Sequence, residues 1–257
     1  MRIPAVHRQN LFSTLFDWGT AGAEALAGDA DVAVVVDVLS FTTTVTVALE
    51  AGATVLPYPW RDDSAAAFAD RQGAVLAVGR SQAGSGRVSL SPASMRAHAP
   101  SRGAVVLPSP NGSTIAHRLA SGSTTCVAAC LRNAGAVAEW LDRRFPHPAR
   151  VAVVAAGERW PDRSLRPAVE DLWGAGAVLA ALAARGRPGF SPEAHAARAT
   201  YDAIRPDLPV ALHACAGGQE LDAIGFGADV DVAAEVDASS VVPVLRDGAF
   251  VDAAALG

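Results

Sequence analysis

The sequence contains no lysine: all 21 of its basic residues are arginine. Schiff-base enzymes and pyridoxal-phosphate enzymes need a lysine amine for their covalent intermediates, so both classes are excluded. A P-loop nucleotide site is excluded as well, since its lysine contacts the nucleotide phosphates. Arginine remains available, and its planar, permanently charged guanidinium group suits the recognition of carboxylate and phosphate groups.

Positive charge, cysteine and long apolar runs are also scarce. The formal net charge of −5 argues against a nucleic-acid-binding protein, which needs a basic surface. No apolar run approaches the roughly 20 residues of a membrane helix, and the polar segment 1–10 lacks the apolar core of a signal peptide. With three cysteines, a disulfide framework is not expected. We therefore expect a cytoplasmic protein that binds neither nucleic acid nor membrane.

Motifs for several other chemistries are absent. The six histidines form no H-x-H or H-x-x-x-H pair and the cysteines no C-x-x-C, so a zinc site is not expected. No G-x-G-x-x-G segment follows an expected strand. Cys126 and Arg132 have the C-x5-R spacing of tyrosine phosphatases. However, Cys126 lies in an expected strand and no glycine between the two could form a phosphate loop, which argues against a thiol nucleophile.

Strand-like and helix-like segments alternate along the first two thirds of the 257 residues. The β-branched run 31–39 predicts a buried strand, and 168–185 the longest helix. Such alternation indicates an α/β protein with a mostly parallel sheet and helices on both faces. Near the C-terminus, 241–245 and 249–252 flank an Asp-Gly pair and predict a β-hairpin. Linker-like stretches are short, so we expect residues 1–257 to form a single domain, which could have two lobes.

The first candidate motif is the segment 37–44, Asp-Val-Leu-Ser-Phe-Thr-Thr-Thr. An acid near the end of a strand is followed by hydroxyl residues at a helix start, where free N–H groups and the helix dipole suit phosphate. Asp37 is placed to hold a metal ion or to attack the substrate, and Ser40, Thr42 and Thr43 to bind it. The same pattern also fits a plain helix cap beside a buried, hydrogen-bonded acid.

The second candidate motif follows a later strand and again opens a helix. It reads Asn111, Gly112, Ser113 and Thr114. The Asn-Gly pair permits a tight turn, and the two hydroxyls can cap the helix or bind an oxyanion. An ordinary turn with a cap is the alternative. Ligands of open α/β sheets bind beyond the carboxyl ends of the strands, so two hydroxyl-rich helix starts there favour anion binding.

The third candidate motif is a charged loop and helix start that carry Glu158, Arg159, Arg166, Glu170 and Asp171. The two acids at the helix start could simply complement the helix dipole. Carboxylates supplied from several strand ends are, however, the ligands that Mg²⁺ requires. Nearby arginines would hold phosphate or a second anionic group through paired N–H donors. The residues thus predict a magnesium site that acts on an anionic phosphate ester.

Two weaker candidates lie elsewhere. Arg80, in a glycine-rich loop, could contact an anionic substrate, although such a residue is more often solvated. Asn133 follows the strand expected at 124–129 and could contact substrate or cap the next helix.

The chain resembles the 2-phosphosulfolactate phosphatase (ComB) family. The resemblance rests on VVVDVLSFTTT, PSPNGST, LRNAGAVAEWL, GERWPDRSLRPAVEDLWGAGAV and DASSVVPVLRDG, which stand in the family's order between residues 31 and 250. Family members commonly read Asp-Val-Leu-Arg-Ala-Thr at the first motif, whereas this chain has Ser40 and Phe41 in place of Arg and Ala. The reaction class therefore carries over more readily than the substrate.

The resemblance implies an α/β, Mg²⁺-dependent acid phosphatase that converts 2-phospho-3-sulfolactate to 3-sulfolactate and phosphate, a step of coenzyme M synthesis. Two alternative functions stay open: a phosphatase for another small anionic phosphate ester, and a protein that binds such esters without turnover. A homo-oligomer also stays possible. Attack by water and a phosphoenzyme also stay open. The expected site residues are, for catalysis, Asp37, Asn111, Glu158 and Arg159; for the metal, Asp37, Glu170 and Asp171; and for the substrate, Ser40, Thr42, Thr43, Arg80, Gly112, Ser113, Thr114, Asn133 and Arg166.

Overall fold

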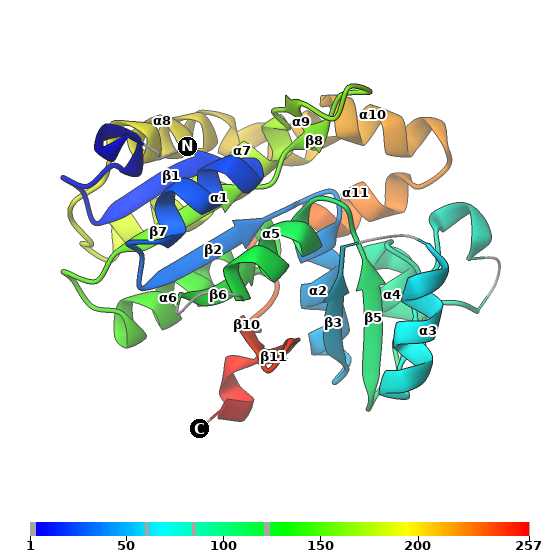
Figure 1. The fold of residues 1–257 in the computed structure, drawn as a ribbon. Helices are drawn as coiled ribbons and strands as arrows, with labels where there is room; N and C mark the ends of the chain where they lie inside the picture. The colour runs from blue at the N-terminus through cyan, green and yellow to red at the C-terminus, as the bar shows by residue number, and fades with distance from the viewer. Residues whose placement is uncertain (1–3, 60–61, 84–85, 121–123, 257) are drawn as a thin grey trace.

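The computed structural model describes residues 4–59, 62–83, 86–120 and 124–256. Within that part of the chain, nine strands form one sheet in the order β1-β7-β2-β6-β10-β11-β3-β5-β4. Figure 1 shows how the helices and strands are arranged. The strands are β1 (Thr14–Trp18), β2 (Val32–Val36), β3 (Thr54–Tyr58), β4 (Val75–Leu76), β5 (Ala104–Pro108), β6 (Thr125–Ala129), β7 (Val151–Ala155), β10 (Pro243–Arg246) and β11 (Ala249–Asp252).

Strand β2 shows why the sheet is buried on both faces. All five of its residues are buried, and neighbours β6 and β7 run parallel to it. Val32, Val34 and Val36 point into one hydrophobic cluster, while Ala33 and Val35 point into another on the opposite face. A continuous β-branched run suits a strand covered on both faces. The predicted parallel sheet is therefore confirmed.

The predicted C-terminal hairpin is also confirmed, but it occupies the middle of the sheet. Strand β10 pairs antiparallel with β6, where Val244 lies opposite Val127. Strand β11 pairs antiparallel with β3, where Phe250 lies opposite Val55. The hairpin thus joins two parallel groups, β1-β7-β2-β6 and β3-β5-β4. Local sequence predicts the turn of a hairpin but not which distant strands it will pair with.

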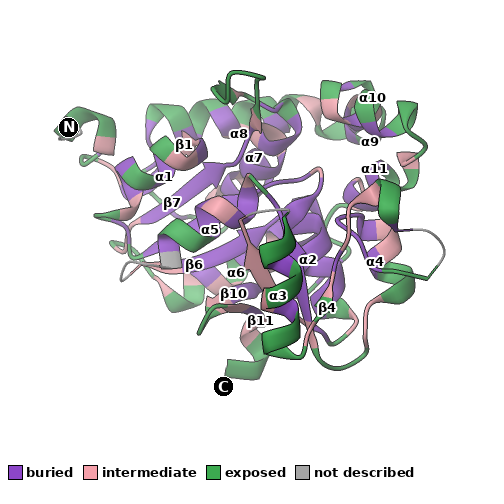
Figure 2. Cartoon of the chain, turned by 45° about the vertical axis from the view of Figure 1, so that its right-hand side comes forward, coloured by how far each residue is buried: buried purple, intermediate pink, exposed green. Residues whose placement is uncertain are grey.

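Helices cover both faces of the sheet, and the strands lie buried between them (Figure 2). One face carries α6 (Ala134–Arg144), α7 (Val169–Ala184) and α8 (Pro192–Ile204). The other carries α1 (Gly19–Ala27), α2 (Phe41–Glu50), α4 (Pro92–His98) and α5 (Gly112–Ala120). The remaining α-helices of the described chain are α3 (Asp63–Gln72), α9 (Leu208–Ala214), α10 (Ala216–Ala223) and α11 (Gly227–Ala233).

Some elements were not expected from the sequence. The sequence pattern does not predict the first strand and helix, β1 and α1, or the helix α11. The charged loop after β7 contains a short antiparallel hairpin, β8 (Glu158–Arg159) and β9 (Leu165–Arg166). Each of these elements is short, so periodicity gives little signal. None of the helices in the described ranges has the length and apolar character needed to cross a membrane.

Candidate active site

Asp37 connects the first two candidate motifs. It follows the last residue of β2, and its side chain is buried. Its Oδ1 accepts a hydrogen bond from the Phe41 N–H (3.1 Å), and its Oδ2 accepts one from the Gly112 N–H (3.0 Å). A Cβ at Gly112 would lie 2.3 Å from Phe41 Cδ1 and 2.8 Å from Asp37 Oδ2, so only glycine fits there. One carboxylate thereby brings together the starts of α2 and α5, and its bond to Gly112 spans 75 positions of sequence.

The threonines of the first motif hold the turn in shape. Thr42 Oγ1 donates to the Asp37 carbonyl oxygen (2.8 Å), and Thr43 Oγ1 donates to the Val38 carbonyl oxygen (2.7 Å). Both side chains are fully buried. This geometry favours the capping role that the sequence left open over direct contact with substrate. Ser40 differs, because its Oγ accepts a hydrogen bond from Arg80 Nη2 (2.6 Å).

Asp171 ties the third motif to the first. Its Oδ1 accepts from the Val38 N–H (2.7 Å) and its Oδ2 from the Gly157 N–H (2.8 Å), which joins the start of α7 to the loops after β2 and β7. Burial raises the pKa of Asp171 well above the usual range for an aspartate, and the charges of Asp37 and Glu170 raise it further. These three acids therefore lie close enough to repel one another.

Glu158 completes the acidic cluster. Its Oε2 accepts a hydrogen bond from Asn111 Nδ2 (2.8 Å), and Arg159 Nε in turn donates to Asn111 Oδ1 (3.3 Å). Burial, followed by the charge of Asp37, raises the pKa of Glu158 to about 7, while Asn111 and Arg166 act in the opposite direction. Glu158 can therefore hold or release a proton near neutral pH.

Glu170 lies beneath the start of α10. Its side chain is buried, and a Cβ at Gly217 would lie 2.3 Å from its Oε1, so a larger residue at position 217 would displace the Glu170 carboxylate. Four carboxylates, from Asp37, Glu158, Glu170 and Asp171, thus converge at the carboxyl ends of β2 and β7. Within the described ranges, no three His, Cys, Asp or Glu side chains form a group that could itself hold a metal ion.

Other predicted residues have mainly local contacts. Ser113 Oγ donates to the Leu107 carbonyl (3.2 Å) and Thr114 Oγ1 to the Pro110 carbonyl (2.7 Å), so both support the turn before α5. Arg166 lies over the Trp160 ring, with 5.8 Å between its guanidinium carbon and the ring centroid. The positive charge of Arg166 opposes the rise in the pKa of Glu158, which places Arg166 near the acidic cluster.

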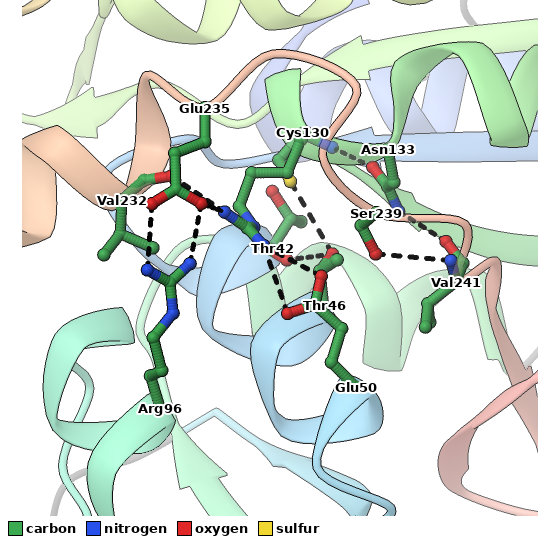
Figure 3. Close-up of polar contacts among 11 residues, drawn as sticks. Thr42, Thr46, Glu50, Arg96, Cys130, Asn133, Val232, Glu235, Ser239 and Val241 are labelled. Carbon is green, nitrogen blue, oxygen red and sulfur yellow. Dashed lines mark hydrogen bonds and ion pairs between the residues drawn. The ribbon is translucent and has the colours of Figure 1, made fainter.

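Asn133 lies in a polar network with Cys130 and Val241 (Figure 3). Its Oδ1 accepts from the Cys130 N–H (2.8 Å), and its Nδ2 donates to the Val241 carbonyl (3.1 Å). These bonds hold the segment that leads into β10, which favours a structural role for Asn133 over contact with substrate. The spacing suggested a cap, and the longer-range bond to Val241 could not be foreseen.

The cysteines have no nucleophilic environment. Cys126 is buried within β6, and burial raises the pKa of its thiol to about 12. Cys130 is buried as well, with its Sγ 3.6 Å from Thr46 Oγ1 (Figure 3). Nucleophilic cysteines need a lowered pKa and access to substrate. Cys126 therefore lacks the environment of a thiol nucleophile, as its position in a strand predicts.

Asp171→Asn is expected to lower the free energy of unfolding by about 1–3 kcal/mol. The amide offers one acceptor oxygen, so its NH₂ group would face the N–H of Val38 or Gly157. Urea denaturation with EDTA present, which removes any metal contribution, measures the change. Glu170→Gln is the matched control, since Glu170 is equally buried but accepts no backbone N–H within the described chain. Equal losses in the two variants would contradict this role for Asp171.

Comparisons with known proteins all point to the same family. A family model described as 2-phosphosulpholactate phosphatase matches residues 23–248. A protein from Thermus thermophilus named probable 2-phosphosulfolactate phosphatase is 34% identical over 218 residues, which cover 84% of this chain and 88% of the relative. A protein of the same name from Deinococcus radiodurans is 31% identical over 233 residues, which cover 88% of this chain and 92% of the relative.

Proposed function

We propose, because the chain belongs to the 2-phosphosulfolactate phosphatase family, that it hydrolyses 2-phospho-3-sulfolactate to 3-sulfolactate and phosphate in the presence of Mg²⁺. The family is one of phosphoric monoester hydrolases. In this reaction the bond between phosphorus and the ester oxygen breaks, the oxygen of water bonds to phosphorus, and the departing alcohol oxygen takes up a proton.

The observation that carries the proposal is the convergence of Asp37, Glu158, Glu170 and Asp171 beyond the ends of β2 and β7. Four mutually repelling acids in a buried site need protons or a cation to offset their charge. Mg²⁺ fits this donor set, since it binds through one or two carboxylates together with waters and substrate phosphate oxygens. We assign Asp37 and Glu170 as the residues that would hold it, with Asp171 supporting both loops. When bound, Mg²⁺ would neutralise charge on the phosphoryl oxygens.

Protein groups supply the other requirements of the reaction. Glu158, with a pKa of about 7, can hold the proton that the departing alcohol oxygen needs, and Asn111 fixes its carboxyl group. A catalytic acid works best when its pKa lies near the operating pH. Arg80, Arg159 and Arg166 provide guanidinium donors for phosphate, carboxylate and sulfonate oxygens. Attack on phosphorus by water differs from attack by Asp37 in one observable respect, since only the second route forms a phosphoenzyme.

Phosphate release from a panel of esters tests this function. The panel contains 2-phosphosulfolactate, 2-phospholactate, glycerol 3-phosphate and p-nitrophenyl phosphate. We expect the highest kcat/KM with 2-phosphosulfolactate, because it presents the most anionic groups to the arginines. A higher value for another ester would assign the chain a different small phosphorylated substrate. Tight binding of the esters without phosphate release would identify a binding protein.

A further inference from the structure

Asp229 is a buried acid of α11 that the sequence motifs did not single out. The residue is fully buried. One carboxylate oxygen accepts from Ser91 Oγ and from the Ala93 N–H (3.2 Å), and the other accepts from Arg80 Nε (2.9 Å). A buried charge is stable only when it is paired and hydrogen-bonded. The start of α4 therefore fixes the Asp229 carboxylate, and the carboxylate in turn fixes Arg80.

Arg80 has donors left after these contacts. Its Nε–H bonds to Asp229 and one Nη2–H bonds to Ser40 Oγ (2.6 Å). A guanidinium group has five N–H donors, and Nη1 makes no hydrogen bond within the described ranges. The Phe226 ring centroid lies 5.8 Å from the guanidinium carbon of Arg80. The Arg80 side chain is 18% exposed. Arg80 is thus held in one orientation, beside the turn that carries Asp37, with free donors.

Arg132 is an example of a purely structural arginine in the same protein. It is 3% exposed, and both of its Nη atoms have acceptors. Nη1 bonds to the Val232 carbonyl and to Glu235, and Nη2 bonds to both carboxylate oxygens of Glu50. Arg96 binds the same Glu235 from α4. This network pins the end of α11 to α2 and α4, so the helix that carries Asp229 is a fixed support.

We propose that Asp229 is a positioning residue that orients the Arg80 guanidinium toward the second anionic group, a carboxylate or a sulfonate, of the phosphate ester. This inference rests on the proposed function. Paired N–H donors recognise a planar or tetrahedral oxyanion only when the guanidinium plane is fixed. Without Asp229, Arg80 would keep its charge but lose its orientation. The binding of an ester whose only anionic group is the phosphate would not depend on the orientation of Arg80.

Steady-state kinetics of Asp229→Asn with two substrates tests the proposal. For 2-phosphosulfolactate we expect KM to rise by about 10–100-fold with kcat changed by less than about threefold, because the lost interaction is made in the ground state. For p-nitrophenyl phosphate, which has no second anionic group, both constants should stay within about threefold. Arg80→Ala should give the same selective loss, and the double variant should be no worse than Arg80→Ala alone. Ser91→Ala is the matched control, since it removes another donor to the same carboxylate but keeps the bond to Arg80.

Four results would overturn the proposal. They are an unchanged KM, an equal loss with both substrates, additive effects in the double variant, and a Ser91→Ala loss as selective as that of Asp229→Asn. Asp229→Ser takes the place of Asp229→Asn if the latter unfolds, as judged by thermal melting. If the wild-type protein releases no phosphate from any ester, the proposed function fails. Calorimetric binding of 3-sulfolactate then decides this proposal: about tenfold weaker binding to the variant supports it, and equal binding contradicts it.

Discussion

Replacing Asp37 with asparagine is expected to lower kcat/KM for phosphate release by about a thousandfold. The Asp37 carboxylate lies at the centre of the acidic cluster, since its charge raises the pKa of both Glu158 and Asp171. The Asn side chain can still accept one of the two backbone N–H groups that bind Asp37, so the fold should survive. Removing this charge would weaken the attraction of the cluster for a cation. Asp70→Asn, at an exposed position of α3, is the control and should keep full activity.

The same residue allows a test of the covalent alternative. Each Asp37 carboxylate oxygen accepts a backbone N–H, and such bonds stabilise the charged form and lower its nucleophilicity. We therefore expect no phosphate adduct on the wild-type protein when it is quenched rapidly during turnover and its peptides are weighed by mass spectrometry. A borohydride-trappable adduct on the peptide that contains Asp37 would make this residue the nucleophile instead.

Removal of divalent metal with EDTA is expected to reduce phosphate release by more than about a hundredfold, and added Mg²⁺ should restore it. The reason is the negative charge of the cluster, which would repel a phosphate dianion unless a cation offset it. Ca²⁺ is the comparison ion, because its larger size and longer bonds suit a flexible site with more oxygen ligands. Full activity in excess chelator would contradict the assignment of a metal.

Affinity for Mg²⁺ should also depend on pH in a defined direction. Glu158 has a pKa of about 7, so it becomes protonated as the pH falls below that value and the cluster loses negative charge. The dissociation constant should therefore rise by up to about tenfold per pH unit below pH 7, and binding should release protons. Titration calorimetry in two buffers of different ionisation enthalpy measures both effects. In Glu158→Gln the dependence should flatten, and an unchanged slope would exclude Glu158 as its source.

The same raised pKa predicts the stability of the metal-free protein. Between pH 4.5, the ordinary pKa of a glutamate, and about pH 7, the folded chain retains the Glu158 proton that the unfolded chain has lost. Folding therefore binds protons in this window, and stability should fall as the pH rises through it. Mg²⁺ should offset the loss.

The sequence predicted those parts of the site that lie directly after strands. Asp37, Asn111 and Glu158 each follow a strand, and strand ends meet at one edge of a parallel sheet. Their joint position is thus a consequence of the α/β pattern. The contacts between them are less predictable, because the Asp171 bond to the Val38 N–H spans 133 positions of sequence. A short polar side chain carries no local sign of so distant a partner.

The threonines and Asp229 show two further limits. Hydroxyls at a helix start can either cap the turn or bind an anion, and only the burial of Thr42 and Thr43 distinguishes these roles. Asp229 lies in a short helix with no motif, so nothing in its neighbours indicates a buried partner. Arg80 was selected from the sequence only as a weak candidate, and its support from Asp229 came from the fold.

The position of the β10–β11 hairpin sets an order of assembly for the nascent chain. Residues 243–252 form the last two strands of the sheet to be synthesised, yet they join the two parallel groups of that sheet. Until they emerge, β6 and β3 each present an open edge of unpaired backbone groups, which other chains can extend. Pairings between such distant segments form slowly. The interval before residues 243–252 leave the ribosome is therefore the period in which this chain is most exposed to aggregation, and chaperones that cover sheet edges would act then.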